Sequence, residues 1–244
     1  MTQQQPIISI KNLEKSYGTN NVLKGIDLDI MLKILCGLIP EFSGDVNILG
    51  FDLKKDSLDI KRRIGYIPEN ADIYDTLTPM EYLHFVGELQ EMDSADIQQK
   101  IEKLLALFDM QKHADERMDS FSKGMKQKIL IISGLLHNPD IIFMDEPLSG
   151  LDANAVIVVK EILSKLAKEG KTIFYSSHIM DVVEKISNRI ILIDKGKVIA
   201  DGSFSELNHQ AQTGSLEILF TQLTGTSGHS QKAEEIINVF ENNK

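Results

Sequence analysis

The spacing of apolar positions changes along this chain of 244 residues, and each change predicts a different kind of element. Apolar and polar residues alternate over 25–30 (GIDLDI), and residues 7–30 as a whole are expected to be rich in β-strand. Two further strands are predicted over 45–50 and 63–68, around a short helix. Residues 79–118 then show helical spacing, so a helical region separates these strands from the rest of the chain.

In the second half of the chain, helical and strand-like patterns alternate, which indicates βα units and a parallel sheet. A helix is expected to begin at the N-cap Ser122 and to end before Pro139. The run 141–146 (IIFMDE) is short and apolar, which is typical of a strand buried on both faces of a parallel sheet. Two more strands are predicted over 189–194 and 197–202.

Residues that suit a phosphate and a metal ion stand at the ends of two of these elements. Lys123-Gly124 leaves open backbone behind Ser122, and amides at a helix N-terminus favour a phosphate. Asp145 and Glu146 end the apolar strand, where open α/β sheets bind ligands. Asp145 is placed to hold Mg²⁺ through water, and Glu146 to polarise an attacking water.

Together these segments resemble the motifs of ATP-binding-cassette (ABC) ATPases. FSKGM is similar to the signature motif, IIFMDEP to the Walker B strand with its catalytic glutamate, and SGLD to the D-loop. YSSH resembles the switch-histidine segment, KSYG the adenine-stacking A-loop, and IGYIPEN the Q-loop. Lys123 and Met125 depart from the commonest signature residues, and Glu69 stands where many members have Gln. The motifs keep the family's order and span most of the chain.

The resemblance implies a role for each matching side chain. It implies that Glu146 is the catalytic base, that His178 contacts the γ-phosphate, and that Asp145 is the metal-side acid. It implies nucleotide-site contacts for a further set: Tyr17, Glu69, Ser122, Gly124 and Asp152. ATP and Mg²⁺ are the cofactors that these roles imply.

Several of these side chains also have a plainer interpretation. Taken alone, Tyr17 is an ordinary loop aromatic, and His178 a strand-end histidine with a backbone partner. Glu69 follows Pro68 and reads equally well as a solvated turn acid. Asp152 is expected to cap the helix that follows it, whatever else it does.

The chain departs most from the family after Ile30. There the family has roughly 20 further residues that hold a second strand and the phosphate-binding loop G-x-x-x-x-G-K-[ST] (Walker A). Here a run from Met31 follows at once, and it resembles the helix after that loop, so this helix is expected to start off a strand without a capping residue. The triplet Gly170-Lys171-Thr172 follows helical residues and is predicted to end a helix. We therefore expect the central strand and phosphate loop to be missing.

The fold expected from the resemblance is α/β. It combines a P-loop NTPase-like parallel sheet, an N-terminal antiparallel β subdomain and a helical signature subdomain over about 76–120, with the central strand and loop deleted after Ile30. Residues 1–222 would form this ATP-binding domain. Residues 223–244 would form a polar tail with a short helix over 233–240. The stretch 215–225 resembles the ending of bacterial exporters whose ATPase is a separate polypeptide.

Composition narrows the class of partner. A net charge of −10 argues against a nucleic-acid surface, because phosphate backbones require clustered Lys and Arg. Cys36 is the only cysteine, so no internal disulfide is possible and a buried apolar role is expected. No signal peptide is apparent at the start, and the longest apolar run is far too short to span a membrane. Membrane contact is therefore expected through a partner protein.

The resemblance leads to two hypotheses of different class. The first is the ATPase subunit of an ABC exporter, cytoplasmic and peripheral on the inner face of the membrane through a transmembrane permease, and paired with a second ABC subunit as a homo- or heterodimer. The second is a non-enzymatic subunit that docks on a membrane partner or lends its signature motif to an intact subunit. Without the phosphate loop, the chain itself is predicted to be inactive or nearly so. A soluble ABC protein of translation or DNA repair is disfavoured, since no tandem cassette is present.

Overall fold

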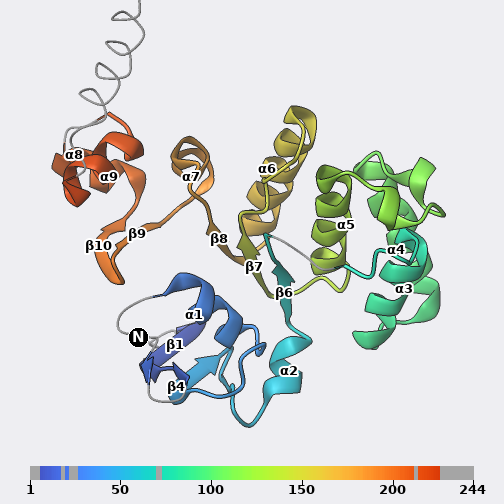
Figure 1. Ribbon diagram of the computed structural model, residues 1–244, viewed down its shortest axis with the longest axis horizontal. Helices are drawn as coiled ribbons and strands as arrows, with labels where there is room; N and C mark the ends of the chain where they lie inside the picture. The colour runs from blue at the N-terminus through green and yellow to red at the C-terminus, as the bar shows by residue number, and fades with distance from the viewer. Residues whose placement is uncertain (1–5, 18–19, 22–26, 70–72, 212–213, 226–244) are drawn as a thin grey trace, which may run out of the picture. The chain divides into compact units, whose positions relative to one another are not determined.

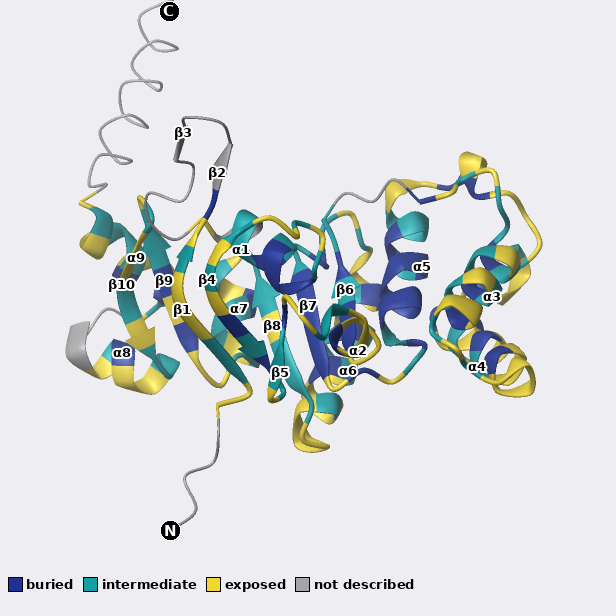
Figure 2. Cartoon of the chain, turned by 90° about the horizontal axis from the view of Figure 1, so that it is seen from below, coloured by how far each residue is buried: buried dark blue, intermediate teal, exposed yellow. Residues whose placement is uncertain are grey.

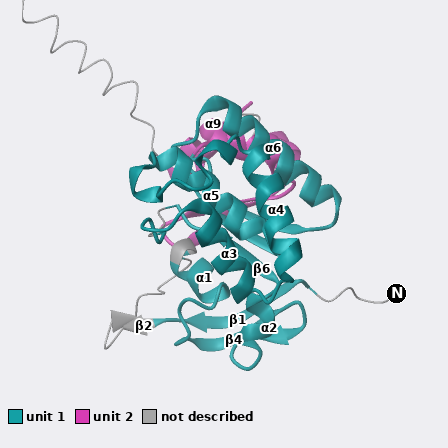
Figure 3. Ribbon diagram, turned by 90° about the vertical axis from the view of Figure 1, so that its right-hand side faces the viewer, with its two compact units in different colours: residues 1–178 teal, residues 179–244 magenta. Residues whose placement is uncertain are grey.

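The computed structural model describes residues 6–17, 20–21, 27–69, 73–211 and 214–225. It divides into two compact units, Met1–His178 and Ile179–Lys244, which are coloured separately in Figure 3. The division at residue 178 does not test the predicted domain boundary at residue 222, which stays a prediction. The helix predicted over 233–240 lies outside the described residues.

A parallel sheet lies at the centre of the first unit (Figure 1). Its strands are β6 (Ile64–Ile67), β7 (Ile141–Asp145) and β8 (Thr172–Ser176), in that order. Both pairings are parallel. The first four residues of β7 are buried, as expected for a strand covered on both faces. The predicted α/β class with a parallel core is therefore confirmed.

The N-terminal part of the unit is antiparallel, as the resemblance implied. Strand β1 (Ile8–Glu14) pairs with β4 (Ser43–Ile48), and β4 pairs in turn with β5 (Phe51–Asp52). The register places Ile8 opposite Ile48. A separate two-stranded ribbon joins β2 (Ser16–Tyr17) to β3 (Asn20–Asn21).

The first helix differs from the prediction. Helix α1 (Leu28–Leu35) begins inside the stretch expected to be a strand, and Asp27 is its N-cap. One Asp27 carboxylate oxygen accepts a hydrogen bond from the backbone N–H of Ile30 at 3.1 Å. The expectation that this helix starts at Met31 without a cap is therefore wrong. The Asp27 cap pairs a backbone amide that would have no partner if the helix began without a cap, and the helix buries its apolar residues in the core. Together these two effects favour a helix more than the alternating pattern favours a strand.

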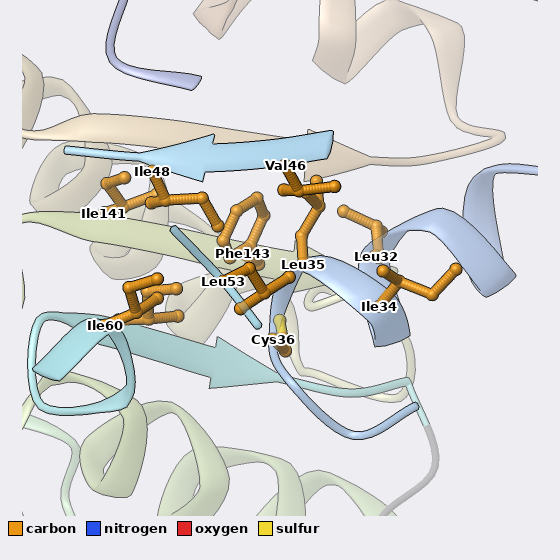
Figure 4. Close-up of a cluster of buried hydrophobic side chains, with 11 residues drawn as sticks. Leu32, Ile34, Leu35, Cys36, Val46, Ile48, Leu53, Ile60, Ile141 and Phe143 are labelled. Carbon is orange, nitrogen blue, oxygen red and sulfur yellow. The ribbon is translucent and has the colours of Figure 1, made fainter. Parts of the chain in front are cut away.

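A single apolar cluster joins α1 to both sheets, and Figure 4 shows its side chains meeting between the elements. Phe143 and Ile141 of β7 lie fully buried within it. Cys36 is buried beside them, as predicted, and burial raises the pKa of its thiol to about 12. The cluster has these buried members: Leu32, Ile34, Leu35, Cys36, Val46, Ile48, Leu53, Ile60, Ile64, Ile141 and Phe143.

Helices occupy the middle of the chain where helical spacing predicted them. Thr78 and Glu81 form a capping box at the first of these helices, with Pro79 at its start. Ser122 caps the signature helix, as predicted. The helical elements of this unit after α1 are α2 (Ser57–Lys61), α3 (Pro79–Leu89), α4 (Ser94–Leu107), the 3₁₀ turns Gln111–His113 and Met118–Ser120, α5 (Lys123–Leu135) and α6 (Ala153–Lys168).

The second unit has its own small core. Strand β9 (Ile190–Asp194) pairs antiparallel with β10 (Lys197–Gly202), which confirms the two strands predicted there. Its helices are α7 (Met180–Ile186), α8 (Phe204–Ala211) and α9 (Leu216–Thr224). Five buried residues form its core: Ile190, Leu192, Leu207, Leu216 and Leu219. Across the described ranges of both units, no helix has the length and apolarity that a bilayer span requires.

Candidate functional site

Two adjacent strand ends bring the predicted catalytic carboxylates and the predicted switch histidine together. Asp145 ends β7 and lies in register with Ser176 at the end of β8. The Ser176 hydroxyl donates a hydrogen bond to the Asp145 carboxylate. The next residue, Glu146, has a φ of 44°, an uncommon conformation for a residue with a side chain, and this turns the chain sharply after the strand.

The Glu146 carboxylate is held by the two residues that follow β8. Ser177 Oγ donates to one carboxylate oxygen at 3.1 Å. The backbone N–H of His178 donates to the other at 2.7 Å, and the His178 Nδ1 lies 2.7 Å from the same oxygen. The His178 side chain is 79% exposed whereas that of Glu146 is 17% exposed, so the imidazole remains open to solvent. The structure thus places a half-buried carboxylate beside an exposed histidine.

The signature segment packs against the loop predicted as the D-loop. The Ser122 hydroxyl accepts a hydrogen bond from the backbone N–H of Met125 at 3.2 Å. Lys123 Nζ lies 3.0 Å from the Ser149 hydroxyl oxygen. A Cβ on Gly124 would stand 2.5 Å from the Gly150 carbonyl oxygen, so glycine is required at this close approach.

Asp152 acts as a cap, as predicted. One carboxylate oxygen accepts from the Ala155 backbone N–H at 2.9 Å, and the other lies 3.3 Å from Lys128 Nζ. The Ala155 hydrogen bond and then the Lys128 ammonium lower the pKa of the Asp152 carboxyl below its ordinary value. Its predicted nucleotide contact stays a prediction beside this structural role.

Two further candidates come from other strands of the chain. Tyr17 ends the short strand β2, and Glu69 is half-buried two residues after β6. Within the described residues, no hydrogen bond or ion pair joins Glu69 to Asp145, Glu146 or His178. The roles that the resemblance implied for Tyr17 and Glu69 remain predictions.

The Gly170-Lys171-Thr172 triplet follows helix α6 and leads into β8, as predicted. Gly170 follows α6 with a φ of 88°, the left-handed conformation common after a helix C-terminus. The ammonium of Lys171 donates to the Asn138 carbonyl oxygen at 3.1 Å. The Lys171 side chain therefore links the loop after α6 to the loop after α5.

Sequence reasoning missed the serines that hold the carboxylates. Ser176 and Ser177 were treated only as the residues before His178. The signal for them was their place at a strand end beside a second strand that itself ends in Asp145 and Glu146, because parallel strands finish at the same sheet edge.

Asp145 and Ser176 offer the kind of side chain that the metal side of an ATP site needs. Asp145 offers carboxylate oxygen beside the Ser176 hydroxyl, which is the kind of ligand Mg²⁺ prefers. No group of three or more His, Cys, Asp or Glu arranged to hold a metal was found among the residues with described positions. At the start of α1, the Asp27 carboxylate accepts a hydrogen bond from the Ile30 N–H.

The fold is that of an α/β nucleotide-binding domain, and similarity to known proteins identifies its family. A family model described as "ABC transporter" matches residues 30–149. The ABC transporter ATP-binding protein NatA of Bacillus subtilis is 35% identical over 191 residues, which cover 78% of each chain. The Nod factor export ATP-binding protein I of Cupriavidus metallidurans is 28% identical, over 82% of this chain and 72% of that one. A solved ATP-binding subunit of an ABC transporter is 26% identical, with a TM-score of 0.81 over 90% of this chain and 100% of the other.

The chain belongs to the family of ABC transporter ATP-binding subunits. Members of this family use ATP and Mg²⁺, pair with transmembrane permeases and form dimers.

Proposed function

We propose that this chain descends from the ATP-hydrolysing subunit of an ABC exporter and docks on a transmembrane permease at the cytoplasmic face of the membrane. The observation that carries the proposal is the Glu146–His178 pair beside Asp145. In this proposal Glu146 is the base, His178 is the γ-phosphate contact, and Asp145 is the metal-side acid. The exporter assignment rests on the resemblance of residues 215–225 to exporter endings.

The remaining candidates complete the proposed site. Tyr17 stacks on adenine, and Glu69 lies at the point where metal and permease are coupled. Ser122, Gly124 and Asp152 serve the site of a paired ABC subunit, since each ATP in this family lies between two subunits.

We further propose that the chain itself binds Mg-ATP very weakly. The sequence contains no G-x-x-x-x-G-K-[ST], and Asp27 occupies the start of α1. Each charged hydrogen bond to phosphate contributes about 1.5–3 kcal/mol, so losing several of them weakens binding by several orders of magnitude. Adenine stacking on Tyr17 does not replace this loss.

Titration calorimetry of the purified chain with Mg-ATP tests the binding proposal, with a loop-containing relative as the control. We expect no detectable heat of binding from the chain and clear binding by the relative. A micromolar dissociation constant for the chain would refute weak binding.

Affinity purification of the chain from membranes of the native host tests docking on a permease. It should recover a membrane protein with several spanning helices, and the absence of such a protein would contradict docking.

A second candidate function is that of a non-enzymatic partner in a mixed dimer. Its support is the ordered signature segment, in which Ser122 caps α5 and Gly124 packs on the Gly150 carbonyl. Ser122 and Gly124 would close an ATP site on an intact subunit. Adding a tenfold excess of the chain to an intact homologue should then change its rate of hydrolysis, whereas a Ser122→Ala variant should change it less. An unchanged rate with the unaltered chain would end this candidate.

A further inference from the structure

Helix α5 carries a long polar side chain in a buried position. Among the described residues, the buried polar or charged side chains are Lys15, Gln127 and Ser133, and the last two belong to α5. Figure 2 shows α5 largely buried beside the parallel sheet. Ser133 Oγ donates to the Leu130 carbonyl of its own helix at 2.8 Å. Gln127 is 2% exposed, and burying its amide is costly unless a hydrogen bond compensates, so the partner of this amide indicates its role.

The partner of Gln127 lies in the loop that follows β7. Gln127 Nε2 donates to the Pro147 carbonyl oxygen at 3.3 Å. Pro147 is buried and comes directly after Glu146. Because a buried carbonyl without a donor is unfavourable, this hydrogen bond fixes the peptide unit after Pro147, one residue from Glu146.

The backbone of Glu146 needs support from its surroundings. Its φ of 44° lies in the left-handed region, which a residue with a side chain adopts only where neighbouring groups hold it. The Glu146 N–H donates to the Ser176 carbonyl at 3.1 Å, and the Glu146 carbonyl accepts from the Ser149 N–H at 3.0 Å. These two bonds come from the sheet and from the turn itself. Gln127 adds a third support from α5, through Pro147.

The turn directs the Glu146 carboxylate to His178. One carboxylate oxygen accepts from the His178 backbone N–H and lies 2.7 Å from His178 Nδ1. An ionised carboxylate only accepts hydrogen bonds, so this contact requires the imidazole proton on Nδ1. Because hydrogen bonds decide which ring nitrogen carries the proton, a movement of the Glu146 carboxylate would be detected at the His178 ring.

We propose that Gln127 is a positioning residue, whose hydrogen bond to Pro147 holds the turn at Glu146 and so keeps the Glu146 carboxylate against His178. The inference rests on the proposed function for its meaning in catalysis, since Glu146 and His178 are there the base and the γ-phosphate contact. It assigns no contact between Gln127 and a ligand. It gives the interior of α5, as well as its Ser122 end, a part in the site.

Two variants of α5 separate positioning from packing. Gln127→Met removes the amide donor but keeps an unbranched side chain of similar length, so the core should remain filled. Ser133→Ala is the matched control, because it also removes a buried hydrogen bond, but one that stays within α5. Melting curves would show that both variants fold. Gln127→Leu repeats the test with a second apolar side chain.

Nitrogen-15 NMR of the His178 ring at a fixed pH measures the contact without any nucleotide. The ring signals are assigned by their disappearance in His178→Gln. We expect Gln127→Met and Gln127→Leu to shift both ring nitrogens, and Ser133→Ala to leave them in place. Hydrogen exchange at the amides of Glu146 and Ser149 should become about fivefold faster or more in Gln127→Met, as expected for the loss of one hydrogen bond.

The outcomes distinguish this proposal from its alternatives. Unchanged ring signals and unchanged exchange in a folded Gln127→Met would overturn the positioning role. Equal ring shifts in Gln127→Met and Ser133→Ala would also overturn it, because the cause would then be a general loosening of α5. Failure to recover a membrane partner would contradict the proposed function but leave the NMR result standing.

Discussion

The N-termini of α1 and α5 share a geometry but differ in charge. Asp27 accepts from the Ile30 N–H at 3.1 Å, and Ser122 accepts from the Met125 N–H at 3.2 Å. Each is an N-cap whose side-chain oxygen binds the third amide of its helix. The cap of α1 is a carboxylate, whereas the cap of α5 is a hydroxyl followed by Lys123.

We predict that this difference decides which helix start can face a phosphate. The positive end of a helix dipole attracts any anion, including one from its own chain. At α1 the Asp27 carboxylate supplies that anion from within. At α5 the cap brings no negative charge, and Lys123 adds a positive one. We therefore expect the start of α5, rather than that of α1, to be open to a phosphate.

The largest expected effect comes from returning a phosphate loop to α1. A strand and a G-x-x-x-x-G-K-[ST] segment inserted between Ile30 and Met31 would divide α1 and should separate the Asp27 cap from the helix that continues from Met31. We expect ATP affinity to rise by several orders of magnitude and Mg-dependent hydrolysis to appear, measured as phosphate release. An insert of equal length with the loop lysine replaced by alanine is the control. Equal activity from both inserts would contradict the comparison.

The Glu146→Gln variant tests whether the hydrolysis gained by the insertion uses Glu146 as its base. In the repaired protein it should preserve ATP binding and suppress turnover by at least about a hundredfold, because an amide cannot accept a proton from water. His178→Ala should also lower turnover there. In the present chain, Glu146→Gln should leave phosphate release unchanged. If the present chain already hydrolyses ATP and loses that activity on Glu146→Gln, another group holds the phosphates.

The next effect concerns the close packing behind the α5 start. Gly124→Ala would place a Cβ 2.5 Å from the Gly150 carbonyl oxygen. We expect a destabilisation of about 1–3 kcal/mol, seen in thermal or urea unfolding. Gly202→Ala is the control, because its Cβ would stand 3.3 Å from a side-chain oxygen of Glu206, a contact that a shift of a few tenths of an ångström relieves. Similar losses for both variants would show that the Gly124 contact relaxes freely.

Removing the Asp27 or the Ser122 cap should change the unfolding free energy less, and by about the same amount at each helix. Asp27→Ala and Ser122→Ala should each cost about 1 kcal/mol of unfolding free energy. Asp27→Asn should cost little, since asparagine caps as well as aspartate. A loss from Asp27→Ala much below that from Ser122→Ala would mean that the α1 start is not held by its cap.

The smallest effect is a pH dependence at a third cap, Asp152. Its pKa is lowered in the folded chain, so its contribution to stability is present above the ordinary value of 3.8 and is lost as pH falls through the lowered one. Asp152→Asn should remove this part of the acid sensitivity below about pH 4. Unfolding curves of both proteins between pH 3 and 6 would show it, and parallel curves would count against it.

Local signals were enough for much of the fold. The apolar run ending in Asp145 predicted a buried parallel strand, and Ser122 predicted the start of α5, because each depends on neighbours along the chain. Gly170 marked the end of α6 in the same way. The motif order alone predicted the family to which the chain belongs.

Tertiary structure decided the rest. The stretch 25–30 alternates like a strand, yet its last residues are helical, because the Asp27 cap and the core beneath α1 outweigh a short periodic pattern. The hydrogen bonds from Ser176 and Ser177 to Asp145 and Glu146 required the pairing of β7 with β8. Contacts between residues far apart in sequence depend on register and packing, which no local pattern contains, so the sequence predicted the candidate residues and the fold determined which of them meet.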